Sequence, residues 1–126
     1  MRNLTDHIVE GDSVNHQLMA SVMDEPGAGG ACHKYFVSIP SKVDGLPETG
    51  THIDFQNGPI KEAGVNGLTQ EVLLAIVIDR LRSFQAGPFS CRENAIALTH
   101  CEDALMWLQR RTRARIARGV EGTHEK

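Results

Sequence analysis

The chain has 126 residues, of which 40% are apolar, 23% charged and 5% aromatic. This length predicts one small domain over residues 1–126, and the apolar share excludes a chain that is disordered throughout. The formal net charge of -3 is too small to indicate broad attraction to nucleic acid or membranes, and no apolar run is long enough to cross a bilayer.

The first half of the chain has the residue types of a small antiparallel sheet. Residues 1–14 are polar and without periodicity, so we expect a flexible arm there. Residues 15–25 and 31–39 are typical of the two strands of a hairpin, because the glycine-rich run between them suits a connecting loop. Apolar and polar side chains alternate in residues 51–58, which predicts a third, half-exposed strand. The antiparallel strands are therefore expected within residues 15–60.

The second half predicts a long helical hairpin over residues 68–119. The first helix is expected over residues 70–86, with Thr69 as its N-cap and Gly87 closing it in the left-handed conformation. Its apolar residues cover most of the circumference, which is more than a single layer can bury. A second helix or a neighbouring subunit must therefore cover the remaining face.

A second, longer helix is predicted after the short proline-containing link. Ser90 and Glu93 have the spacing of a capping box, in which each side chain bonds the other residue's free backbone N–H. No glycine or proline follows before Gly119, which permits a helix of about 28 residues. The short link requires the two helices to be antiparallel. Residues 120–126 are expected to form a mobile tail, and the whole fold is predicted to be α+β.

Five arginines crowd into nine positions near the end of the second predicted helix. They are Arg110, Arg111, Arg113, Arg115 and Arg118. Residues 110–126 carry a balance of +4, whereas residues 1–109 carry -7. Arg111 and Arg115 are one turn apart on the same face, an arrangement that suits paired hydrogen bonds to phosphates. A solvated basic helix end, favourable with the helix dipole, explains the same pattern.

Aromatic residues are few, and two of them lie on the predicted helices. A base can stack on the ring of Phe84 at the end of the first helix, although a last core residue is the alternative. Trp107 is expected to pack at an interface or within the hairpin. No spacing indicates a metal site, a cofactor or a catalytic constellation. Three cysteines cannot all pair and no signal peptide is evident, so we expect a reduced, intracellular protein.

Longer motifs within residues 50–124 resemble the Thoeris anti-defence sponge family of bacteriophages. They are FQNGPI, GVNG, LLAIVIDRL, CRENAIALTHCEDALMWL and RT-x-x-R-x-x-RGVEGT. The helical hairpin is also similar to that of the anti-CBASS sponges. The resemblance implies a non-enzymatic protein in the cytoplasm of the infected bacterium that sequesters cyclic ADP-ribose isomers and blocks Thoeris immunity. It further implies dimers that assemble into a hexamer, and in some members separate sites for cyclic di- and trinucleotides.

Carried over by position, the resemblance implies that Arg111 and Arg115 bind the diphosphate of the ligand and that Phe84 stacks on its adenine. Asn94 matches a residue of the second, cyclic-oligonucleotide pocket. In some members a basic residue that follows the NGP loop also belongs to that pocket; here Ile60 follows the loop directly and Lys61 comes one position later. A small hydrolase that degrades the messenger, and a basic hairpin that binds nucleic acid polymers, are the alternatives. The lack of a candidate base argues against the first and the acidic body against the second.

Overall fold

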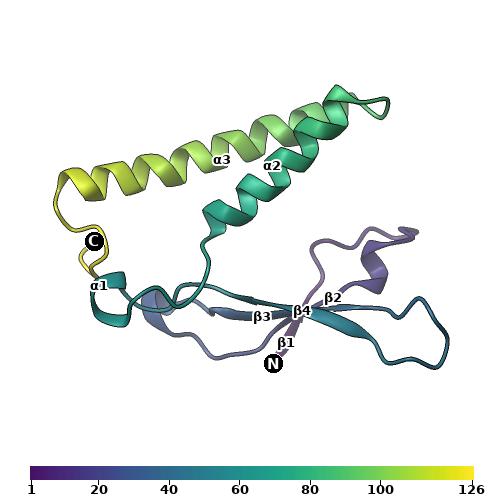
Figure 1. The fold of residues 1–126 in the computed structure, drawn as a ribbon, viewed down its shortest axis with the longest axis horizontal. Helices are drawn as coiled ribbons and strands as arrows, with labels where there is room; N and C mark the ends of the chain where they lie inside the picture. Colours follow the sequence, from purple (N-terminus) through teal and green to yellow (C-terminus); the bar gives the residue numbers. More distant parts are fainter. The chain divides into compact units, whose positions relative to one another are not determined.

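The computed structural model describes residues 1–126 and gathers them into two compact units (Figure 1). The sheet unit consists of residues 1–58 and 65–68, and the hairpin unit consists of residues 59–64 and 69–126. The single domain predicted for the whole chain stays a prediction. The sheet precedes the helical hairpin in the chain, which confirms the predicted α+β class.

The sheet unit holds four antiparallel strands in the order β1-β2-β3-β4. Their bounds are β1 Arg2–Leu4, β2 Met19–Val22, β3 Lys34–Ile39 and β4 Thr49–Asp54. Val22 is 1% exposed and forms the centre of this small core. The ring of Tyr35 meets that of Phe55 edge to face, with 5.6 Å between the ring centroids. Alternating side chains thus pack on a pleated sheet, as the period of two in β4 predicts.

The prediction of a flexible arm over residues 1–14 is wrong for Arg2–Leu4. These form β1, which pairs with β2 so that Asn3 lies opposite Ser21. The hydroxyl of Ser21 donates to the side-chain oxygen of Asn3 at 3.0 Å. A three-residue polar strand carries no periodic signal, because its stability comes from the backbone of its partner rather than from its own apolar side chains.

The strand predicted over residues 15–25 is shorter than expected. Its beginning is a 3-10 turn over Asn15–Gln17, and only β2 is extended. The turn forms because the carboxylate of Asp12 accepts hydrogen bonds from the backbone N–H groups of Val14 at 2.6 Å and Asn15 at 2.9 Å. Side-chain bonds of this kind compete with sheet pairing.

Asp24 organises the connection between β2 and β3. Its carboxylate accepts hydrogen bonds from the backbone N–H groups of His33 at 3.0 Å and Lys34 at 3.1 Å. A ring nitrogen of His33 lies 2.9 Å from the carbonyl of Ala28 and ties down the glycine-rich loop. The backbone hydrogen bond from His33 is the main cause that lowers the pKa of Asp24 below its ordinary value of 3.8.

Asp24→Asn is expected to reduce the loss of stability in acid. A lowered pKa means that the folded state favours the charged carboxylate. The resulting stabilisation is present above the ordinary pKa and is lost as the pH falls through the lower folded-state value. Urea unfolding at about pH 6 and about pH 3 should show a smaller difference for this variant than for the wild type. Asp6→Asn, which changes an exposed carboxylate, is the control, and identical profiles for all three proteins would contradict the prediction.

The motifs FQNGPI and GVNG meet in the sheet unit. The side chain of Asn66 accepts a hydrogen bond from the backbone N–H of Asn57 and donates one to its carbonyl, both at 2.8 Å. Its own backbone N–H donates to the side-chain oxygen of Gln56 at 2.9 Å. A Cβ on Gly67 would lie 2.4 Å from the carbonyl carbon of Phe55, so only glycine fits there. These contacts explain the parts of the two motifs that lie in this unit, residues 55–58 and 65–67.

The hairpin unit contains the short helix α1 and two long antiparallel helices (Figure 1). The helices are α1 Ile60–Ala63, α2 Gln70–Ala86 and α3 Arg92–Ala117. α2 and α3 pack along one another, with Ile78 only 3% exposed and an ion pair of 2.7 Å between Arg82 and Glu102 across the pair. No helix of the chain has both the length and the hydropathy that a membrane span needs.

The ends of the long helices confirm some local predictions and correct others. The hydroxyl of Thr69 accepts from the backbone N–H of Val72 at 3.2 Å, as an N-cap should. Gly87 is extended, with φ at -110°, so the prediction of a left-handed residue there is wrong. Its backbone N–H instead bonds the carbonyl of Phe84 at 3.2 Å. Gly119 does take a positive φ of 73° where α3 stops, as predicted.

The predicted capping box at Ser90 and Glu93 is not formed. The N-cap of α3 is Cys91, whose sulfur accepts from the backbone N–H of Asn94 at 3.4 Å. The side-chain oxygen of Gln85 at the end of α2 accepts from the backbone N–H of Cys91 at 3.1 Å. This bond to the preceding helix fixes Cys91 at the cap and moves the helix start by one residue. The spacing of Ser90 and Glu93 alone does not predict the contact with Gln85.

Candidate functional site

The last turns of α3 gather the five arginines of the chain's basic end, here defined as Arg110, Arg111, Arg113, Arg115 and Arg118. Four of them are exposed and Arg115 is only 8% exposed. Cζ of Arg110 lies 5.2 Å from the centroid of the Trp107 ring, a cation–π distance. The two arginines with predicted phosphate roles, at 111 and 115, are one helical turn apart but have very different surroundings.

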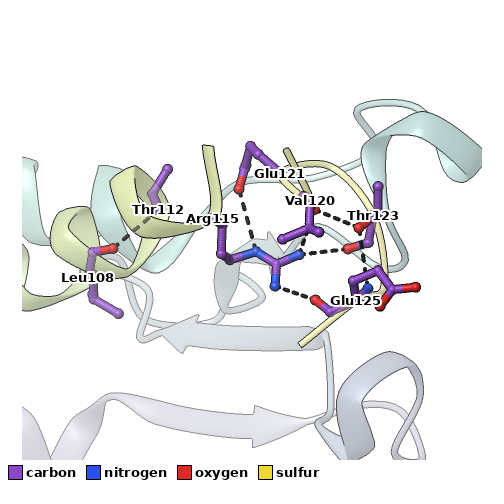
Figure 2. A network of polar contacts seen from close by, with 7 residues as sticks. All are labelled: Leu108, Thr112, Arg115, Val120, Glu121, Thr123 and Glu125. Carbon is purple, nitrogen blue, oxygen red and sulfur yellow. Dashed lines mark hydrogen bonds and ion pairs between the residues drawn. The ribbon is translucent and has the colours of Figure 1, made fainter. Parts of the chain in front are cut away.

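Arg115 is enclosed by the segment that follows α3 (Figure 2). Its Nη2 donates to the carbonyl oxygens of Val120 and Thr123, both at 2.9 Å, and its Nη1 donates to the carbonyl of Glu125. The carboxylate of Glu121 lies 3.6 Å from its Nε. The buried guanidinium is thus neutralised and hydrogen-bonded within the chain, as a buried charge must be.

The segment 120–126, predicted as a mobile tail, is held by contacts on two sides. Besides Arg115, it contacts α1: the backbone N–H of Lys61 donates to the carbonyl of Gly122 at 3.0 Å. A ring nitrogen of His124 lies 3.0 Å from the carboxylate of Glu62. The prediction of mobility rested on the two glycines of the segment, and glycines do not reveal contacts with α3 and α1.

Arg111 differs from Arg115 in being exposed and free of any protein partner. It lies one turn earlier on the same face of α3, and Arg110, Arg113 and Arg118 are exposed nearby in the sequence. A guanidinium in this state offers all its donors to a ligand, and its planar fork suits the paired oxygens of a phosphate. The predicted role of Arg111 requires such an available group.

Phe84 lies at the other end of the hairpin. Its ring is half-buried, and Cζ of Arg80 lies 5.0 Å from the ring centroid. The stretch of α3 from Asn94, beside the turn between the helices, to Arg111 rises about 26 Å. Figure 1 shows the turn and the basic end at opposite ends of the helix pair. One chain therefore does not bring the ring and the predicted phosphate ligands together.

The two residues predicted for a second site are also apart. Asn94 is half-buried in the first turn of α3, whereas Lys61 is exposed on α1, beside the segment that encloses Arg115. Lys61 is thus nearer to the basic end than to Asn94 within the hairpin unit. The roles predicted for all five site residues stay predictions.

An apolar groove lies between α2 and α3, and none of the predicted site residues lines it. It has a volume of about 620 Å³ and is lined by Gln70, Leu73, Leu74, Val77, Ala104, Trp107 and Leu108. Trp107 is 59% exposed and Val77 is 44% exposed, which is unusual for large apolar residues packed side by side. The excess apolar circumference of the first predicted helix was the sequence signal for this surface. No three His, Cys, Asp or Glu side chains gather so as to hold a metal ion.

Comparison with known proteins relates this chain to one family. A family model described as the Acb2/Tad1 hairpin domain matches residues 47–113, which include α2 and most of α3. A curated relative, Thoeris anti-defense 1 of Bacillus phage SBSphiJ7, is 58% identical over 74 residues. The aligned part covers 59% of this chain and 52% of the relative, so the chain spans about half the length of that protein. Arg111 lies within the range of the family model, and Arg115 lies beyond it.

Proposed function

The chain belongs to the family of the Acb2/Tad1 hairpin domain, and from this premise we propose that it binds and sequesters cyclic ADP-ribose isomers without degrading them. Loss of the free messenger would leave Thoeris immunity inactive in the cytoplasm of the infected bacterium. The name of the relative, an anti-defence protein of a phage, supports the biological role. The observation that carries the ligand class is the exposed guanidinium of Arg111 within the basic end of α3.

A sponge has different chemical needs from an enzyme. Catalysis requires groups that bind the transition state better than the substrate, whereas sequestration requires only tight binding of the ground state. Arginines suit this task because they stay protonated and form paired hydrogen bonds with phosphate oxygens. A base stacked on Phe84 would add about 1–3 kcal/mol of binding free energy without any reaction.

The ring and the arginines of one pocket would come from different copies of the chain. Phe84 and Arg111 of a single chain are separated by most of the length of α3, which is too far for one nucleotide messenger to contact both. The exposed apolar groove at Trp107 and Val77 supports assembly, because a second copy packed there would remove it from water. Dimers that assemble into a hexamer are the assembly proposed for this protein.

Cyclic di- and trinucleotides are the ligands proposed for a second site. Asn94 would supply an amide for base or ribose contacts, and Lys61 a positive charge for a phosphate. Since the two lie in different parts of the hairpin unit, this site too would combine residues of two copies.

Recovery of intact messenger tests the sponge. The protein is mixed with a small excess of cyclic ADP-ribose isomer and freed of unbound ligand. It is then heat-denatured, and the supernatant is analysed by chromatography and mass spectrometry. We expect the full amount of bound compound to return unchanged. Appearance of linear ADP-ribose would contradict the sponge and favour a hydrolase, and absence of any bound compound would contradict binding.

A further inference from the structure

The segment from Val120 to Glu125, named the strap here, takes up the hydrogen-bonding capacity of Arg115 (Figure 2). A guanidinium has five N–H groups. Three of them donate to carbonyl oxygens of the strap, and the Nε–H lies beside the Glu121 carboxylate at 3.6 Å. The side chain is only 10% exposed, so the strap covers most of it.

Hydrogen bonds within the strap give it a defined conformation. The hydroxyl of Thr123 donates to the carbonyl of Val120 at 2.6 Å, and the backbone N–H of Thr123 donates to the same carbonyl at 3.1 Å. Gly122 takes a positive φ of 80°, which lets the chain turn back over the guanidinium. Its carbonyl is bonded by Lys61 of α1. The strap therefore has one defined closed form in which it contacts both α3 and α1.

A phosphate cannot bind Arg115 while the strap is closed. A paired hydrogen bond needs two neighbouring N–H groups on one edge of the guanidinium, and the strap leaves no such edge. In addition, the carboxylate of Glu121 would stand next to the phosphate, and two negative charges at that distance repel strongly in a partly buried place. The strap carbonyls and this carboxylate occupy Arg115 in the way that an anionic ligand would.

We propose that the strap is an internal competitor of the ligand, and that a diphosphate bound at Arg111 and Arg115 replaces the strap and opens it. This inference rests on the proposed function, which places the diphosphate at these two arginines. Opening also releases Gly122 from the backbone of Lys61, so occupation of the basic end changes the surroundings of α1. Arg111 makes the first contact because it is free, and Arg115 becomes available as the strap leaves.

Two variants of the full-length chain weaken the strap without touching an arginine. Glu121→Gln removes the competing carboxylate and keeps its shape, and Thr123→Val removes the hydroxyl that bonds Val120. Each is expected to tighten binding of cyclic ADP-ribose about fivefold in calorimetry, because less of the closed form must be displaced. Glu10→Gln makes the same change of charge on an exposed side chain of the sheet unit, and is expected to bind as the wild type does.

Hydrogen exchange of the strap supplies a second readout. Saturation with cyclic ADP-ribose is expected to speed exchange of the Thr123 amide, which is bonded to Val120 in the closed form. If both variants bind the ligand with unchanged affinity and this amide exchanges more slowly, the strap does not compete with the ligand. The proposed sequestration of the messenger would be unaffected by that result. No heat of binding in the wild type or any variant would overturn the proposed function itself, and the strap's role with it.

Discussion

Arg111→Glu is expected to weaken binding of cyclic ADP-ribose by about 100-fold or more. The substitution removes an exposed guanidinium that offers all its donors and places a carboxylate against the phosphates. A loss of this size corresponds to about 2.7 kcal/mol of binding free energy. Because Arg111 is exposed and forms no hydrogen bond or ion pair within the chain, circular dichroism and thermal unfolding should match the wild type. Isothermal titration calorimetry measures the affinity.

Arg113→Glu is the matched control for this prediction. It makes the same change of charge two residues further along α3, on a side chain that is also exposed and lies on another face of the helix. Only its long-range charge acts on the ligand, so we expect a loss of a few-fold that disappears at high salt. Equal losses in the two variants would show that general positive charge, and not a contact of Arg111, holds the ligand.

Val77→Asp is expected to convert the assembled protein to monomers. Val77 lines the apolar groove between α2 and α3 and is 44% exposed, so the free chain accepts a carboxylate there at small cost. In an assembly, the same carboxylate would be buried without a partner, which costs several kcal/mol at each contact. Light scattering coupled to size exclusion measures the mass. The affinity for cyclic ADP-ribose is also expected to fall in this variant, because the ring and the arginines of one pocket come from two copies.

Val43→Asp serves as the control for assembly. Val43 is 56% exposed in the loop between β3 and β4, outside the groove. This variant is expected to keep the mass and the affinity of the wild type. A Val77→Asp protein that remains assembled would exclude the groove as the contact surface. A monomer that binds with full affinity would show that one chain suffices for a site.

The helical hairpin was predictable because its signals are local. The apolar spacing of α2, the hydroxyl of Thr69 and the positive φ required at Gly119 act within one or two turns, and the structure confirms each of them. The caps of α3 and of the end of α2 were not predictable. The backbone N–H of Cys91 donates to the side-chain oxygen of Gln85 in the preceding helix, and this bond depends on how the link between the two helices folds.

In the candidate site, too, some features follow from the local sequence and others depend on tertiary contacts. The crowding of arginines at the end of α3 and the excess of apolar residues on α2 follow from the sequence alone, because helical geometry fixes which side chains share a face. The tertiary structure alone decided that Arg111 is free while Arg115 is enclosed by the strap, and that Phe84 lies at the far end of the hairpin. Hydrogen bonds between residues separated by five to ten positions and a chain reversal at Gly122 produce this difference, and no pattern of residue types encodes them.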